Sequence, residues 1–139
     1  MEAPQLEFAF EARVEIGDPL SVGRTHVGGE RRLVPILGGT VEGPRVAGRV
    51  VPGGADWQVI GDAGEVRLVA RYALELEDGT LVAVTNSGIV RGAGEGRYFR
   101  TTATFEVAEG PHAWLGLSVF VSTAHVEPPF VVLRFFEVR

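Results

Sequence analysis

Apolar and polar residues alternate along several long stretches of this chain. The clearest case is Leu6–Ile16, where every second residue is apolar and most residues between are charged. Alternation with a period of two predicts a β-strand with one buried face. The same pattern recurs in Glu65–Glu77 and in Arg97–Val107. We therefore expect long half-buried strands. In Leu6–Ile16 we expect Leu6 and Phe8 to face the core on the same side as the apolar residues that follow them.

Turn residues separate these stretches. Asp78-Gly79 joins Glu65–Glu77 to Thr80–Arg91, and this dipeptide between two alternating stretches is typical of a tight β-hairpin. The segments Trp114–Thr123 and Phe130–Val138 are apolar on both faces. Such strands are covered on both sides, as in a closed barrel or in a subunit interface.

The stretch Leu33–Gln58 is rich in glycine and contains the pairs Gly38-Gly39 and Gly53-Gly54. We expect strands over residues 33–41, 45–51 and 56–60, with a break at Pro52-Gly53-Gly54. Glycine lets a ligand or a second backbone come close, which makes Gly38 and Gly54 candidate ligand contacts. Barrel corners require glycine as well, so the pattern also has a purely structural interpretation.

These segments add up to about nine strands and no amphipathic helix, which predicts an all-β protein. Residues 19–32 show no period and are interpreted as a surface loop. Long strands with antiparallel neighbours favour a single antiparallel β-barrel of about 8–10 strands over an open sandwich. One domain over residues 1–139 is the natural expectation for a chain of 139 residues that is 45% hydrophobic.

Composition excludes several classes of function. A net charge of −5 argues against nucleic acid and against anionic membrane surfaces as partners. The chain has no cysteine, which rules out disulfides, thiolate nucleophiles and zinc sites built on cysteine. With no cysteine in the chain, a cytoplasmic location is the default expectation. The N-terminus shows no signal-peptide pattern, and no apolar run is long enough to span a membrane.

The order of the motifs PILGGTVEGP, VPGGADWQ, ARYALELEDG, YFRTTATFE and HAWLGLSVFV resembles the bacterial "domain of unknown function 3237" family over nearly the whole chain. The resemblance implies a compact antiparallel β-barrel of calycin-like shape and no settled activity. One departure from the family pattern covers two positions, because Gly116-Leu117 stand where members often carry Asn-Arg. If that arginine binds an anionic group in relatives, this chain takes a more apolar ligand.

Asp56 and Trp57 follow the second glycine pair directly. A carboxylate beside an indole can have its pKa raised, which suits proton transfer near neutral pH. In this interpretation Trp57 is a stacking wall of the pocket and Asp56 is its acid/base. The alternative is that Asp56 caps the glycine turn and Trp57 fills the core.

Tyr72 and Asn86 lie on the apolar phase of two strands joined by the Asp78-Gly79 turn, at similar heights. A phenol and an amide that face one cavity can polarise a carbonyl or stabilise an enolate. The alternative is a hydrogen-bonded pair inside a filled core. The remaining pocket residues that we expect are Phe99, Thr101, Trp114 and Arg134, the last because it shares a phase with Phe136.

Other sites have little support. The three histidines lie in separate loops without metal-ligand spacing, so we expect no metal. The Gly92–Gly96 stretch lacks the βαβ setting of a dinucleotide site, and no cofactor is expected.

The combined hypothesis is a barrel with an apolar pocket for a small hydrophobic or aromatic metabolite. The leading interpretation is a cofactor-independent isomerase, cyclase or lyase with Asp56, Tyr72 and Asn86 as catalytic residues. One alternative is a non-catalytic carrier or sensor of the same ligand. Another is a structural homodimer with a filled barrel, in which Trp114–Thr123 and Phe130–Val138 form the interface.

Overall fold

A computed structural model describes residues 1–139 and contains nine strands and two short 3-10 helices. In chain order the elements are β1 (Leu6–Ile16), β2 (Leu20–Arg24), β3 (Glu30–Glu42), β4 (Ala47–Ile60), β5 (Val66–Leu76), β6 (Leu81–Arg91), η1 (Gly94–Gly96), β7 (Tyr98–Val107), η2 (Ala113–Gly116), β8 (Val119–Glu127) and β9 (Phe130–Val138). No helix has the length and apolar character needed to cross a membrane.

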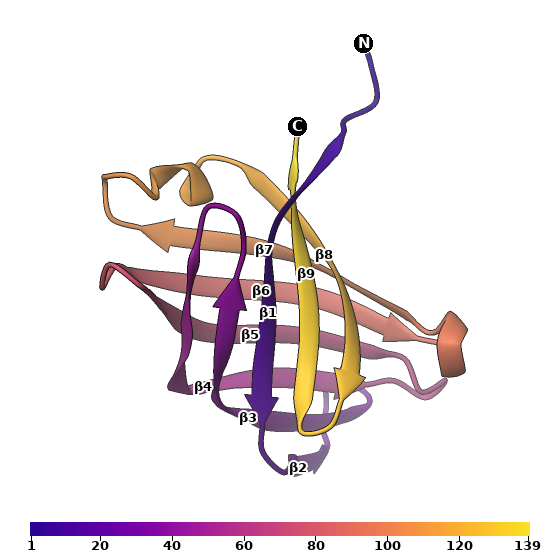
Figure 1. Cartoon of the computed structure of the whole chain (residues 1–139). Coiled ribbons are helices and arrows are strands. Elements are labelled where there is room, and N and C mark those ends of the chain that lie inside the picture. Colours follow the sequence, from indigo (N-terminus) through magenta and orange to yellow (C-terminus); the bar gives the residue numbers. More distant parts are fainter.

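All neighbouring strands are antiparallel, in the order β1-β9-β8-β7-β6-β5-β4-β3-β2. An additional pairing of β1 with β3 closes eight of these strands into a ring and leaves β2 outside. In Figure 1, β1 and β9 run side by side in front, while β5, β6 and β7 cross behind them. The all-β antiparallel barrel predicted from the sequence is therefore confirmed.

The extra strand β2 corrects one prediction, because residues 19–32 were interpreted as a loop without a strand. Leu20–Arg24 pairs with β3, from Leu20 opposite Leu33 to Arg24 opposite Glu30. Its side chains are almost all exposed, so it needs no alternation of apolar and polar residues. Periodicity cannot reveal a strand that buries neither face.

A bulge divides β1 into two parts. The register with β9 shifts between Phe8 and Phe10, which turns the residues before the shift to the opposite face. Phe10 is fully buried, whereas Leu6 is 58% exposed and Phe8 packs edge-on against Phe136 outside the barrel. The expectation that Leu6 and Phe8 face the core is therefore wrong.

Strand β4 continues through Pro52-Gly53-Gly54, so the break expected there is wrong. The segment instead forms an irregularity in which pairing with β5 is lost between Val51 and Ala55. A side chain at Gly54 would place its Cβ 2.5 Å from the carbonyl oxygen of Arg71. Glycine here lets a bent strand stay against its neighbour.

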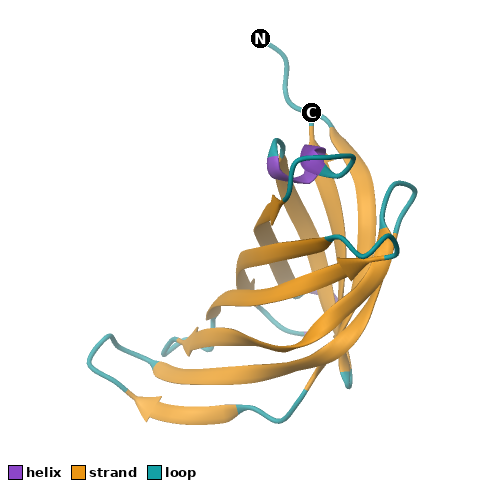
Figure 2. Ribbon diagram, turned by 90° about the vertical axis from the view of Figure 1, so that its left-hand side faces the viewer, coloured by secondary structure: helices purple, strands orange, loops and turns teal.

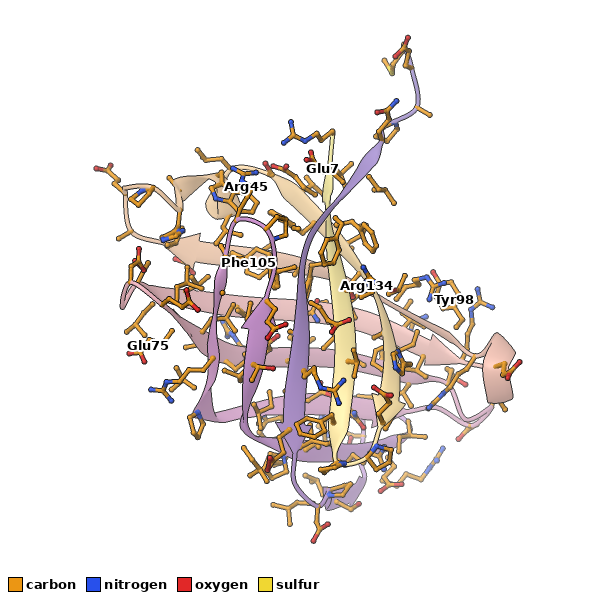
Figure 3. The ribbon with its side chains drawn as sticks, viewed as in Figure 1. Glu7, Arg45, Glu75, Tyr98, Phe105 and Arg134 are labelled. Carbon is orange, nitrogen blue, oxygen red and sulfur yellow. The ribbon has the colours of Figure 1, made fainter.

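One half of the barrel interior is filled by aromatic side chains. Phe10 and Phe135 lie 4.8 Å apart between ring centroids, and Phe105 and Phe120 lie 5.0 Å apart. Phe105, labelled in Figure 3, also contacts both Phe10 and Phe135. A second, smaller apolar cluster is made by Val66, Leu68, Val90 and Phe99.

The filled half ends at η2, which lies at the same end of the barrel as the chain termini (Figure 2). Residues 114–123 were predicted as one strand, but Ala113–Gly116 is helical and β8 begins only at Val119. Trp114 packs against Phe120, and the guanidinium of Arg45 lies 3.6 Å from the centre of its indole (Figure 3). The apolar residues of η2 cover this end of the barrel. A helical turn can cover it as well as a strand can, which is why the apolar pattern did not distinguish the two.

Candidate functional site

A small cavity lies in the barrel where the two apolar clusters meet. Its volume is about 40 Å³. The lining is mostly aliphatic and includes four polar side chains from neighbouring strands, namely Asp56, Tyr72, Asn86 and Thr101. The remaining lining residues are Val14, Ile16, Ile36, Leu68, Ala70, Phe99, Val131 and Leu133. Polar groups are thus concentrated on the β4–β7 side of an otherwise apolar chamber.

The strand register explains why these polar groups meet. Asp56 is paired with Ala70, and Ala70 is paired with Asn86, so the three residues form one row across β4, β5 and β6. Residues in one row point to the same face of a sheet. Because Ala70 carries only a methyl group, the carboxyl group and the amide face each other across a short side chain. Tyr72 lies two residues further along β5, diagonal to both.

Asp56 is held through one oxygen only. The amide nitrogen Nε2 of Gln58 donates a hydrogen bond to Asp56 Oδ2 at 2.8 Å, and Arg32 Nε donates to Gln58 Oε1 at 2.6 Å. The other carboxyl oxygen, Oδ1, is buried and has no hydrogen-bond partner within the chain. The chain Arg32–Gln58–Asp56 therefore fixes the carboxyl group and leaves one oxygen available.

Burial dominates the electrostatics of this carboxyl group. It raises the pKa of Asp56 from an ordinary 3.8 to about 6, against the opposing effects of the Gln58 hydrogen bond and the Arg32 charge. A pKa near 6 leaves Asp56 mostly ionised at neutral pH but able to hold a proton briefly. These are the properties of a general base that works near neutrality.

Tyr72 and Asn86 complete the polar side of the cavity. Burial, with a smaller effect from the Asp56 charge, raises the pKa of Tyr72 well above its usual range. The phenol therefore stays protonated and keeps a hydrogen to donate. Oδ1 of Asn86 is buried without a hydrogen-bond partner. Two acceptor oxygens, on Asp56 and Asn86, are thus unsatisfied inside the barrel, where such groups are rare.

A hydroxyl pair borders the cavity on the β7–β8 side. Thr101 Oγ1 and Ser122 Oγ form a short hydrogen bond in which either can donate. Both side chains are buried. This bond fixes the two hydroxyls and connects the cavity wall to β8.

The structure brings five of the ten sequence-predicted site residues together around the cavity: Asp56, Tyr72, Asn86, Phe99 and Thr101. Trp57 is not among them. It lies on the outer face of β4 and is 44% exposed, so its predicted place in the pocket wall is wrong. Neighbouring residues on a strand point to opposite faces, so Asp56 and Trp57 cannot both face the interior.

Trp114 and Arg134 also lie away from the cavity, and their predicted places in it are wrong. Trp114 belongs to η2, at the aromatic end of the barrel. Arg134 shares its face of β9 with Phe136 as expected, but that face is the outer one, and its guanidinium lies 4.6 Å from the centre of the Phe8 ring (Figure 3). The bulge in β1 brings Phe8 to that outer face.

Gly38 and Gly54 do not line the cavity either. Gly38 has a φ of +149° and nothing closer than Val50 O, 3.8 Å from where its Cβ would be. Gly54 gives the backbone of β4 room against Tyr72. Both glycines therefore serve the bending of the strands rather than contact with a ligand in the cavity.

Three residues around the cavity were not predicted: Gln58, Arg32 and Ser122. Gln58 lies two residues after Asp56 on the same strand, so the inward phase of Asp56 would have included it. Arg32 pairs with Gln58 across β3 and β4. It was overlooked because residues 19–32 were interpreted as a loop. Ser122 pairs directly with Thr101, which only the β7–β8 register reveals.

The cavity offers hydrogen-bonding groups of several kinds. No group of three or more His, Asp or Glu side chains is positioned to hold a metal ion. The donors in the cavity are one carboxylate, one amide and hydroxyl groups. They are suited to hydrogen bonding and proton transfer with an organic molecule.

Fold and site together define a closed antiparallel β-barrel with a buried polar row on one wall of an apolar chamber. A family model described as "Protein of unknown function (DUF3237)" matches residues 4–138. The chain belongs to this family. A UPF0311 protein of Clostridium acetobutylicum is 32% identical over 95% of this chain and 92% of its own length. A UPF0311 protein of Rhodopseudomonas palustris is 39% identical over 87% of this chain and 89% of its own.

Solved structures share the architecture. A "beta-barrel like protein" of Acinetobacter baumannii has a TM-score of 0.95 and 29% identity, covering 100% of this chain and 98% of its own. A protein of Penicillium herquei that is described as an enzyme has a TM-score of 0.82 and 23% identity, covering 100% of this chain and 97% of its own. At that identity the second likeness shows the fold alone.

Proposed function

We propose that the chain is a cofactor-independent enzyme that isomerises, cyclises or eliminates from a small hydrophobic or aromatic metabolite. The observation that carries this proposal is the half-buried Asp56, held at Oδ2 by Gln58 and left at its buried Oδ1 without a partner. A carboxylate that merely stabilises a fold normally has both oxygens hydrogen-bonded. A protein of the same fold from Penicillium herquei is described as an enzyme, so the proposal is compatible with this architecture.

In the proposed reaction Asp56 Oδ1 accepts a proton from a carbon or hydroxyl group of the substrate. Electron density then moves toward a carbonyl oxygen, which the Tyr72 hydroxyl stabilises by donating a hydrogen bond. Asn86 Oδ1 accepts a hydrogen bond from a substrate donor and so orients the molecule. Protonated Asp56 returns its proton to a different atom, which regenerates the carboxylate and balances an isomerisation or a ring closure. In an elimination the bond to the leaving group breaks and the proton goes to that group, which again regenerates the carboxylate.

The rest of the lining sets the class of substrate. Apart from the polar row, the cavity presents mainly aliphatic side chains and the ring of Phe99. Apolar walls with a few aimed polar groups are typical of sites for small organic molecules. Apolar walls lower the local dielectric, which strengthens each hydrogen bond to the reacting atoms.

The test begins with mass spectrometry of compounds that co-purify with the protein, followed by turnover assays on each compound found. Asp56→Asn and Tyr72→Phe are then compared with wild type. We expect each variant to lose about 10²–10⁴-fold in kcat, the usual contribution of general acid–base and oxyanion groups. Asp18→Asn removes an exposed carboxyl group outside the cavity and is the matched control. Unchanged turnover in both site variants would contradict the roles proposed for Asp56 and Tyr72.

A second candidate is supported by the size of the cavity. Its volume of about 40 Å³ is far below the ~300–1,000 Å³ of typical ligand pockets. A barrel filled to this degree fits a structural protein that associates through its apolar outer surface, where Leu117 and Val119 are 84% and 65% exposed. Light scattering coupled to size exclusion tests this candidate. It predicts a stable dimer that Leu117→Glu or Val119→Glu dissociates, and no co-purifying compound.

A further inference from the structure

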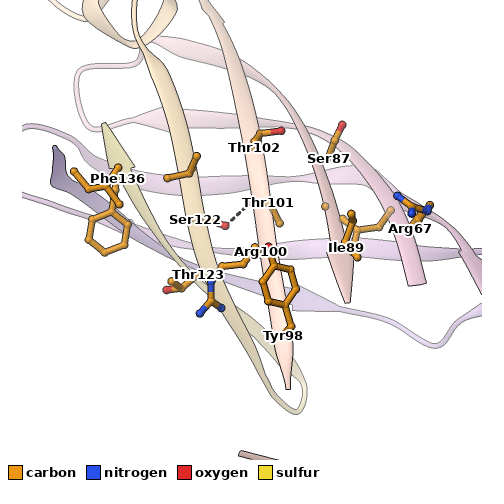
Figure 4. A pocket seen from close by; sticks show the side chains of 14 residues that line it. Arg67, Ser87, Ile89, Tyr98, Arg100, Thr101, Thr102, Ser122, Thr123 and Phe136 are labelled. Atoms are coloured by element: carbon orange, nitrogen blue, oxygen red, sulfur yellow. Dashed lines mark hydrogen bonds between the residues drawn. The ribbon is translucent and has the colours of Figure 1, made fainter. Parts of the chain in front are cut away.

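We propose that the outer face of the barrel carries a second binding site, a groove that binds small organic carboxylates with an aromatic or aliphatic body. The groove has a volume of about 810 Å³ and runs over the outer faces of β5, β6, β7 and β8 (Figure 4). Leu6 of β1 and Phe136 of β9 also line it. Its volume lies in the range of small-molecule pockets, about 300–1,000 Å³.

The groove is positively charged in a protein whose net charge is −5. Its lining contains Arg67 and Arg100 and no carboxylate. Neither arginine takes part in any of the ion pairs of the structure. Five of the thirteen arginines form ion pairs, and these two do not. Arg100 Nη1 donates a hydrogen bond to the carbonyl oxygen of Phe99. Two guanidinium groups without a counter-charge in one groove favour an anionic occupant.

Strand register sets the spacing of the two arginines. Arg67 pairs with Ile89, and Ile89 pairs with Arg100, so the arginines lie on strands two apart with Ile89 between them (Figure 4). At about 4.8 Å between strands, their Cα atoms are roughly 10 Å apart. In Figure 4 the Arg100 side chain lies toward Tyr98 and away from Arg67. Both side chains are long enough to meet at one carboxylate once Arg100 turns from Tyr98, and their planar forks match a carboxylate in geometry.

Tyr98 orders this end of the groove. The guanidinium of Arg91 lies 4.1 Å from the centre of the Tyr98 ring, and that of Arg100 lies 5.3 Å from it. Arg91 and Tyr98 are directly opposite each other on β6 and β7. Cation–π contacts of this kind hold arginine side chains in place before a ligand arrives.

The neighbouring row of side chains supplies an apolar bed. Thr102 pairs with Val121, and Val121 pairs with Phe136, one row away from Arg100 on the same face. Adjacent rows on one face are roughly 7 Å apart along the strands. A ligand with its carboxylate at Arg100 therefore lays its body over Val121 and Phe136, with the hydroxyl groups of Ser87 and Thr102 beside it. This arrangement defines the class of ligand as an amphiphilic carboxylate.

A polyanion fits the groove less well. Nucleic acids require many phosphate contacts along an extended basic surface, and here two arginines line a groove of limited length. The overall negative charge of the chain also repels a long anion. A small molecule with a single negative charge matches the observed charge and size.

The experiment is an NMR titration of the ¹⁵N-labelled protein with 2-naphthoate, and in parallel with its neutral analogue 2-naphthamide. We expect saturable shifts at the amides of Ser87, Ile89, Thr102 and Val121. The neutral analogue should bind at least about tenfold more weakly, because it lacks the charge-assisted bonds. The double variant R67Q/R100Q should bind 2-naphthoate more weakly by a similar factor. Each single variant should show part of that loss of affinity.

The matched control is R49Q, which removes an arginine that already pairs with Glu75 elsewhere on the barrel and should leave 2-naphthoate binding unchanged. D56N should also leave it unchanged, so the outcome is independent of the proposed activity in the inner cavity. Equal binding of the amide, shifts confined to the residues around Asp56, or a preference for an oligoglutamate peptide over 2-naphthoate would each overturn the proposal.

Discussion

Asp56 and Asn86 face each other across Ala70, and each leaves one buried oxygen without a hydrogen-bond partner. Unsatisfied acceptors in a protein interior destabilise the fold by about 1–3 kcal/mol each. A chain that retains two of them on one row gains nothing in stability from the arrangement. Their natural partner is a hydrogen-bond donor that comes from outside the chain, and this relationship underlies the proposed activity.

The stability of the protein should depend on the protonation of Asp56. In the folded state this group holds its proton up to about pH 6, whereas its ordinary pKa is 3.8. Between these values the folded state binds more protons than the unfolded state, so the free energy of unfolding falls as pH rises. The decrease in the free energy of unfolding is complete above about pH 6 and amounts to at most about 3 kcal/mol.

Urea unfolding of wild type and D56N at pH 3 to 7 measures this contribution. D56N lacks the titrating group, so the difference in unfolding free energy between wild type and D56N should change by about 2–3 kcal/mol across this range. D18N, with an exposed carboxyl group removed, should follow wild type. Parallel curves for wild type and D56N would show that Asp56 titrates normally.

Gln58 should tune the proton affinity of Asp56. Its hydrogen bond stabilises the carboxylate and lowers the pKa against the effect of burial. Gln58→Leu removes that bond and separates Asp56 from Arg32, so the pKa of Asp56 should rise above 6. Titration of the side-chain carboxyl carbon by NMR measures the shift. R49Q, another change on β4 but on its outer face, is the control, and an unchanged titration in Q58L would refute the role of the Arg32–Gln58–Asp56 chain.

The Thr101–Ser122 pair allows a double-mutant test of a buried hydrogen bond. Thr101→Val leaves the Ser122 hydroxyl buried without its partner and should cost about 1–3 kcal/mol of unfolding free energy. Ser122→Ala should have a similar effect. The double variant T101V/S122A should be less destabilised than the sum of the two, because no hydroxyl is then left unpaired. Simple additivity in chemical unfolding would mean that the two hydroxyls do not depend on each other.

Gly54 should be replaceable only with a loss of stability. A methyl group there would meet Arg71 O at 2.5 Å and Tyr72 Cβ at 2.6 Å. Gly54→Ala must push β4 away from β5 and should cost about 1–3 kcal/mol. Gly96→Ala, which meets nothing within 4 Å and has an ordinary φ, should change stability by less than about 0.5 kcal/mol. Thermal unfolding of the two variants compares them directly.

The sequence predicts the architecture well because the strands that build it bury one face. The alternation in Glu65–Glu77 and the Asp78-Gly79 turn lead directly to the β5–β6 hairpin and to the inward positions of Tyr72 and Asn86. Irregular features are invisible to such a pattern. The bulge near Ala9 reverses Phe8, and the irregularity at Gly53-Gly54 hides the phase of β4.

The candidate site is predictable only in part, for the same reason. Asp56 was singled out for its chemistry, but its partner Gln58 required knowledge of which face of β4 points inward. Arg32 joins them through the β3–β4 register, which links residues 26 positions apart. Pairing between distant strands depends on how the whole barrel closes, and no local pattern encodes it.

The pairing of the first strand with the last has a consequence for how the protein is made. Leu6 is opposite Val138, and the backbones of Gln5 and Arg139 exchange two hydrogen bonds. On the ribosome β1 emerges first, yet one of its two edges has no partner until β9 has been synthesised. Closure of the ring is therefore a late event that joins segments more than a hundred residues apart. Until then, one edge of β1 remains unpaired during synthesis.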